Sequence, residues 1–157
     1  MPLDEQDRAA WDLGRIREGL RALEHALRLR RPGPYQLQAA ISALHAKAPS
    51  SDEADWAQIA ELYGALGRMS PSPVVEVNRA VAVAFAHGPA AGLELLAPLL
   101  EDGALDHYQP LHAAHAELSR RAGDRAGAAL AYERAIELSS NAVERAELER
   151  RLEALRA

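Results

Sequence analysis

Apolar residues recur along this chain at steps of three and four, in short segments separated by proline, glycine, serine or aspartate. The first segment places Leu13, Ile16, Leu20 and Leu27 on one face of a helix over residues 12–30. Alanine and leucine, with 34 and 23 residues of the 157, supply more than a third of the chain, and both favour helices. Since β-branched and aromatic residues are scarce, the sequence predicts an all-α fold.

Seven further segments show the same pattern. The third of the eight segments follows Ser50 and Glu53, whose spacing is that of a capping box, and the last follows the cap-like pair Asn141 and Glu144. No linker is long enough to divide the chain, so we expect about eight helices in a single domain, residues 1–157. The seven segments cover residues 34–47, 56–66, 73–86, 89–100, 108–122, 124–138 and 141–156.

Several helices are predicted to repeat. The segment Gly88–Leu93 superimposes on Gly123–Ala128 at an offset of 35 residues, close to the period of about 34 in tetratricopeptide repeats. Leu37 matches Val77 at an offset of 40, and Leu111 lies 34 residues further on. Because the connections are short, successive helices must pack as antiparallel neighbours. We therefore predict a short α-solenoid of antiparallel helix pairs, tetratricopeptide-like, with the charged first and last helices as its caps.

A stripe of small residues is predicted to set the distance between the last two repeat helices. Ala128 and Ala135 bracket Tyr132 at steps of four and three, behind the turn at Gly123 and Asp124. Small side chains at such positions let a helix lie close to its partner. The stripe therefore predicts a tightly packed helix pair.

Composition excludes several classes of function. The chain contains no cysteine, which removes disulfides, zinc–thiolate sites and thiol nucleophiles. Its net charge of −5 and isoelectric point near 5.7 argue against a nucleic-acid surface. The first residues lack the basic and apolar parts of a signal peptide, and no apolar run is long enough to span a bilayer. We expect a soluble cytoplasmic protein.

Histidines are the main candidates for chemistry. His112 and His115 lie three residues apart on one predicted helix, with Asp106 and His107 upstream, and this spacing allows a metal site or a small-molecule hydrolase. Ser70 and Ser72 lie between prolines, where helix capping explains them. Nucleophile elbows, Walker loops and dinucleotide fingerprints are absent from the sequence. The favoured interpretation is therefore no enzymatic activity, no metal and no cofactor.

A polar row is the candidate binding surface. With offsets of 40 and 34, Gln38, Asn78 and His112 occupy the same position in three successive first helices, with Arg79 adjacent, on the predicted inner face. Such a row suits a peptide backbone or carboxylate. The alternative is that Gln38 and Asn78 only cap or bridge neighbouring turns.

Two aromatic residues, Tyr35 and Trp56, are further binding candidates. For both, packing in the core is the favoured interpretation, and contact with a ligand is the alternative.

Several stretches resemble the C-terminal tetratricopeptide-like extension of a class of bacterial extracytoplasmic-function (ECF) sigma-70 factors, and the resemblance covers nearly the whole chain. The stretches are Gln6-Asp7-Arg8, Trp11-Asp12, Gly33–Ile41, Asp55-Trp56, Pro71–Val75 and Asn78–Ala82.

The resemblance implies a fragment of a transcription initiation factor that lacks the promoter-binding regions. It implies a regulatory interaction domain, which does not bind nucleic acid or membrane. Its partners would be the sigma-factor core regions or RNA polymerase, and a YCII-related protein is a further candidate partner. The sequence departs from the family pattern at His115, where arginine is common. A stand-alone helical-repeat scaffold and a hydrolase using His112 and His115 are the alternative functions.

Overall fold

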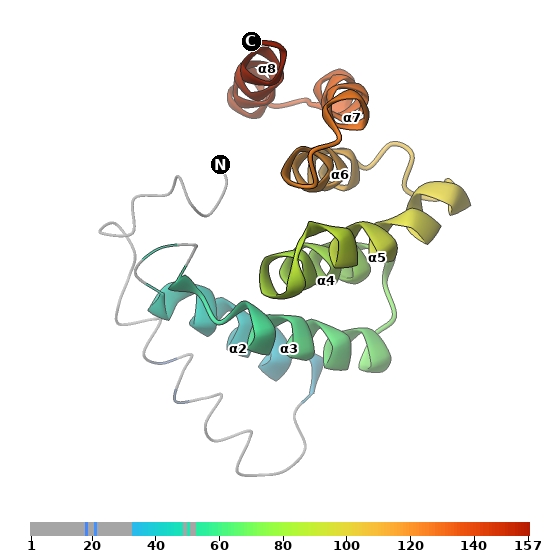
Figure 1. Ribbon diagram of the computed structural model, residues 1–157. Helices are drawn as coiled ribbons and strands as arrows, with labels where there is room; N and C mark the ends of the chain where they lie inside the picture. The colour runs from blue at the N-terminus through green and yellow to red at the C-terminus, as the bar shows by residue number, and fades with distance from the viewer. Residues whose placement is uncertain (1–17, 19–20, 22–32, 49, 51–52) are drawn as a thin grey trace.

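The computed structural model describes residues 18, 21, 33–48, 50 and 53–157 (Figure 1). All the regular structure in these residues is α-helical, so the predicted all-α class is confirmed. The helix expected over residues 12–30 lies outside the described residues, apart from Glu18 and Arg21. The described helices are α2 (Pro34–Lys47), α3 (Trp56–Met69), α4 (Pro73–His87), α5 (Pro89–Asp102), α6 (Gln109–Arg121), α7 (Arg125–Leu138) and α8 (Ala142–Arg156).

Each helix packs against the next in the chain, and α6 also packs against α4. Figure 1 shows the helices stacked in chain order, from α2 and α3 at one end to α8 at the other. Contact between α4 and α6, which skips one helix, places the first helices of successive pairs side by side. This is the arrangement of a helical-repeat fold.

Local sequence explains where most helices begin. Pro34, Pro73 and Pro89 each occupy the start of a helix, where a missing N–H costs no hydrogen bond. The carboxylate of Asp124 accepts the Gly127 N–H at 2.9 Å and caps α7. These boundaries agree with the predicted ones to within two residues.

The predicted cap of α3 is wrong, although the helix begins at Trp56 as predicted. The Ser50 hydroxyl does donate to the Glu53 carboxylate at 3.1 Å, but neither residue caps the helix. Asp55 is the cap, and its carboxylate accepts the Gln58 N–H at 3.0 Å. Asp55 directly precedes the first helical residue, Trp56, so its side chain reaches the free N–H groups of the first turn.

The burial pattern confirms an offset of 34 between α4 and α6. Val77 and Leu111 are both buried, and so are Ala84 and Leu118. The offset of 40 between α2 and α4 is likewise matched, because Leu37 and Val77 are both buried.

The predicted offset of 35 holds for the turn glycines Gly88 and Gly123, whereas the buried positions of α5 and α7 are related by 36 residues. Leu96 and Tyr132, both buried, are equivalent at this offset. Gly88 and Gly123 both have positive φ, at 102° and 86°, but Gly88 alone ends α4 and caps α5. In the later turn Gly123 provides the left-handed residue and Asp124 provides the cap, which adds one residue.

In the described residues the core consists of three clusters, each shared by three consecutive helices. One cluster joins α2, α3 and α4 around Ile59, the next joins α4, α5 and α6 around Leu96, and the last joins α6, α7 and α8 around Tyr132. Ala128 and Ala135 are fully buried beside Tyr132, as the small-residue stripe predicted. Because each cluster lies within a few consecutive helices, the fold is stabilised mainly by near neighbours.

Candidate peptide-binding groove

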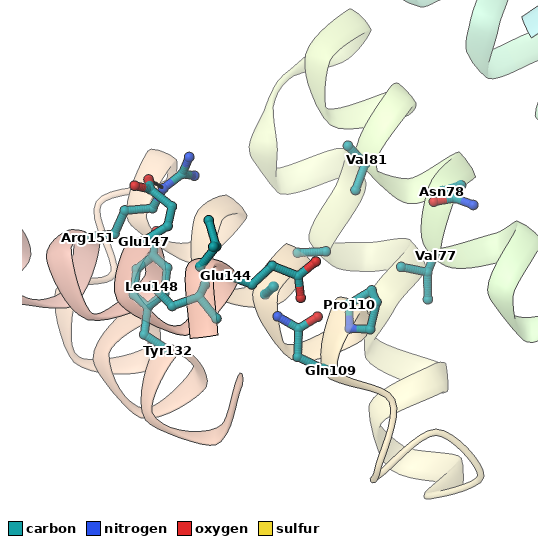
Figure 2. Close-up of a pocket in the computed structure, with 13 residues that line it drawn as sticks. Val77, Asn78, Val81, Gln109, Pro110, Tyr132, Glu144, Glu147, Leu148 and Arg151 are labelled. Atoms are coloured by element: carbon teal, nitrogen blue, oxygen red, sulfur yellow. Dashed lines mark hydrogen bonds and ion pairs between the residues drawn. The ribbon is translucent and has the colours of Figure 1, made fainter. Parts of the chain in front are cut away.

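A groove runs between the first helices of the last repeats. It has a volume of about 480 Å³, within the range of small ligand pockets, and lies between α4 and α8 with α6 at its base (Figure 2). Its lining consists of Val77, Asn78, Val81, Gln109, Pro110, Ala113, Ala114, Tyr132, Val143, Glu144, Glu147, Leu148 and Arg151.

Apolar side chains form most of the groove wall. Val81 on α4 and Ala113 on α6 are half-buried, and Val143 at the start of α8 is 69% exposed. Together these side chains give the groove an apolar surface that solvent can reach. The groove can therefore remove the apolar side chains of a bound segment from water.

Polar groups line the groove from α4, α6 and α8, and most of them are on α8. Figure 2 shows Gln109 and Glu144 extending into the space between α8 and α4, with Glu147 and Arg151 further along α8. The Arg151 Nε donates to the Glu147 carboxylate at 2.5 Å. Burial raises the pKa of Glu147, but hydrogen bonds from its arginine neighbours outweigh this and hold the pKa below its usual value. The wall thus combines amide, carboxylate and guanidinium groups that can pair with a peptide backbone.

Glu117 on α6 connects the helices behind the groove. Its carboxylate accepts hydrogen bonds from Arg120, Arg121 and Tyr132, at distances between 2.8 and 3.0 Å. Arg151 of α8 lies 3.7 Å from the same carboxylate. Burial raises the pKa of Glu117, but its hydrogen bonds outweigh this and lower the pKa to about 2. The ionised carboxylate therefore holds α6, α7 and α8 in register.

One residue of the predicted polar row, Asn78, lines this groove, with its side chain exposed. Gln38 is exposed on α2, away from the groove lining. The His112 Nε2 lies 3.0 Å from the Asp106 backbone oxygen, so this imidazole is held against the loop before α6. The three positions share a register, but the structure does not bring their side chains together.

Arg79 lies on a different face of α4 from Asn78. It forms an ion pair with Glu76 at 3.1 Å and lines a separate cavity of about 640 Å³ with Gly64 and Arg68 of α3. Consecutive helix residues point about 100° apart, which follows from 3.6 residues per turn. Asn78 and Arg79 therefore cannot serve one groove together.

The two aromatic candidates have opposite surroundings. Tyr35 is 87% exposed, so its interpretation as a core residue is wrong. It occupies the first turn of α2, and the first buried position of that helix is Leu37. Trp56 stacks on Phe85 with ring centroids 4.4 Å apart and packs against the first core cluster, which confirms its interpretation as a core residue.

The histidine pair does not converge on a cluster of acids. Burial and the neighbouring His112 lower the pKa of His115, and Asp124 raises it less. In the part of the chain that the structure describes, no three His, Asp or Glu side chains are grouped to hold a metal ion.

Sequence reasoning missed a further cavity, which five arginines line. It measures about 620 Å³ and lies among α6, α7 and α8. The signal was present as a repeated motif, because Glu117-Leu118-Ser119-Arg120-Arg121 and Glu147-Leu148-Glu149-Arg150-Arg151 differ at one position. We call this cavity the arginine pocket; its lining is Glu117, Arg120, Arg121, Arg125, Arg150, Arg151, Ala154 and Leu155.

The chain is similar to an uncharacterized protein of Rhizobium meliloti (strain 1021), with 45% identity over 155 residues. The similarity covers 99% of this chain, which spans 36% of the length of that relative. No protein-family model matches the chain, and no solved structure matches it. Among the described helices, none is both long and apolar enough to cross a membrane.

Proposed function

We propose that this chain is a regulatory protein-interaction domain of an ECF-type sigma factor and that it binds a peptide segment of its partner in the groove between α4 and α8. The groove is the observation that carries the proposal. It combines apolar lining residues with amide groups on α4 and α6 and charged groups on α8, as peptide-binding surfaces do.

The resemblance to the C-terminal extension of ECF sigma factors supplies the context of this binding. The partner segment belongs to the sigma-factor core regions or to RNA polymerase, and a YCII-related protein is the second candidate partner. The chain spans 36% of its Rhizobium relative, as a domain within a longer protein does. In this proposal the domain acts in the cytoplasm, through binding and without catalysis.

Two other functions were considered. A stand-alone helical-repeat scaffold would use the same groove but would not require sigma-factor partners. A hydrolase would need His112 and His115 to face a cavity together with acids, and neither histidine lines the groove or the arginine pocket. Since His112 is also held by the Asp106 backbone oxygen, interaction is the better supported function.

The register of the repeats provides a matched pair of variants. Asn78→Trp places a large ring in the groove, whereas Gln38→Trp places the same ring at the equivalent position of α2, outside the groove. Both side chains are exposed, so both variants should keep the helix content and melting temperature of the wild type.

The measurement is binding of this chain to the purified sigma-factor core regions, core RNA polymerase and the YCII-related protein, by calorimetry. We expect one of them to bind the wild type and the Gln38→Trp variant equally. The Asn78→Trp variant should bind at least about thirtyfold more weakly, as for loss of an interface centre of about 2 kcal/mol. Absence of wild-type binding to all three, or equal binding by both variants, would overturn the proposal.

A further inference from the structure

Five guanidinium groups surround the arginine pocket from three helices. Arg120 and Arg121 come from the end of α6, Arg125 from the start of α7, and Arg150 and Arg151 from α8. Ala154 and Leu155 add an apolar part to the lining. Planar guanidinium groups bind carboxylates in a bidentate fashion, which makes such a ring suited to anionic groups.

Two carboxylates hold four of these arginines, all except Arg125, in place. The Glu117 carboxylate accepts hydrogen bonds from Nε and Nη2 of Arg120, at 3.0 and 2.8 Å. The Glu147 carboxylate accepts hydrogen bonds from Nε and Nη2 of Arg150, at 2.9 and 2.7 Å. Arg121 also lies over the Phe85 ring, 4.2 Å from its centroid. Because the guanidinium groups are fixed before any ligand arrives, binding costs less side-chain entropy.

The lining of the pocket is predominantly positive. Among the described residues, five arginines and a single carboxylate, that of Glu117, line it. In a chain with a net charge of −5, this local excess is a marked asymmetry. It favours an anionic partner through charge complementarity.

The arginine pocket adjoins the groove. Arg151 lines both cavities, and Glu147, which pairs with Arg151, lines the groove. A segment lying in the groove can therefore continue into the arginine pocket. This continuity points to a protein chain rather than to a small free anion.

We infer that the arginine pocket binds aspartate or glutamate side chains of an acidic segment of the partner protein, next to the part of that segment that occupies the groove. The inference rests on the proposed function and adds the chemistry of the partner. A nucleic acid fits less well, because the adjoining groove is lined mainly by apolar side chains, which do not bind a phosphate backbone.

The test uses a fluorescein-labelled hexaglutamate peptide and measures anisotropy. This probe has no apolar side chains for the groove, so it tests the arginine pocket alone, and the Asn78→Trp variant should bind it as the wild type does.

The main variant is Arg120→Gln with Arg150→Gln, which leaves Glu117 and Glu147 each with another arginine. Arg125→Gln is a second variant, because Arg125 donates to the Leu155 backbone oxygen and, among the described residues, to no carboxylate. Arg68→Gln, exposed on α3, is the control.

We expect saturable binding of hexaglutamate that weakens as salt is raised. The double variant should bind about tenfold more weakly and Arg125→Gln several-fold more weakly, while Arg68→Gln should match the wild type. Absence of saturable binding, or equal binding by the wild type and the arginine-pocket variants, would show that the pocket is not such a site. If inorganic phosphate or duplex DNA displaced the labelled peptide at lower concentration than unlabelled hexaglutamate does, the inference that the ligand is an acidic protein segment would be rejected. If Asn78→Trp and Gln38→Trp bound the partner equally while hexaglutamate binding to the arginine pocket was as expected, the proposed function would be rejected and the anion site in the pocket would stand.

Discussion

The Tyr132 hydroxyl donates a 3.0 Å hydrogen bond to the Glu117 carboxylate, joining α7 to α6 beside the groove. Tyr132 is 1% exposed and lies at the centre of the last core cluster. Burial and the Glu117 carboxylate raise the pKa of Tyr132 to about 12, so the hydroxyl keeps its proton and remains a donor. One side chain thus contributes to both the apolar core and the polar network between the two cavities.

Removing only this hydroxyl should have a moderate cost. Tyr132→Phe keeps the ring in the core but takes one donor from Glu117, so we expect the free energy of unfolding to fall by about 1–2 kcal/mol. The control is Tyr63→Phe, since the Tyr63 hydroxyl forms no hydrogen bond with the other described residues. This substitution should change the free energy of unfolding by less than about 0.5 kcal/mol. Urea unfolding measures both, and equal effects of the two substitutions would contradict a role for the Glu117 bond.

Acid should destabilise the fold through Glu117. Its pKa in the folded chain, about 2, lies below its ordinary value of 4.5. The stabilisation by this carboxylate is therefore complete above about pH 4.5 and is lost as the pH falls toward 2. Thermal unfolding between pH 6 and pH 2 measures the effect. Glu117→Gln should have a lower melting temperature at pH 6 and a shallower decline below pH 4.5, and parallel curves for the two proteins would refute the assignment.

Two helical glycines should respond in opposite directions to alanine. A Cβ on Gly92 would lie 2.6 Å from the Ala84 Cβ and 2.7 Å from the Ala80 backbone oxygen, so Gly92→Ala should destabilise the fold by about 2 kcal/mol. A Cβ on Gly64 would meet its nearest atoms, on Arg68 and Arg79, at 3.6 and 3.7 Å.

Gly64→Ala should therefore stabilise the fold by about 0.5–1 kcal/mol, because alanine favours the helix. Chemical denaturation of both variants checks the pair. Equal stability of the Gly92→Ala variant and the wild type would show that α4 and α5 are not in close contact there.

The sequence alone predicted the seven described helices and most of their limits. Prolines at helix starts and the caps Asp124 and Asn141 act through groups within one turn, and they are visible in the sequence for that reason. The offset of 34 between α4 and α6 was also predictable, because equivalent core positions carry small or apolar residues. The offset of 36 between α5 and α7 was missed, because Gly88 fills two roles that Gly123 and Asp124 divide.

Tertiary structure decided which faces of the helices form the sites. The sequence brought Asn78 and Arg79 together as neighbours, but the rotation of α4 about its axis places them in different cavities. The two Glu-Leu-x-Arg-Arg motifs, around Glu117 and Glu147, are 30 residues apart and meet only because α8 packs beside the end of α6 and α7. Helix periodicity follows from local sequence, whereas the rotation and crossing of each helix follow from packing with its neighbours. The groove and the arginine pocket are therefore properties of the stack of helices.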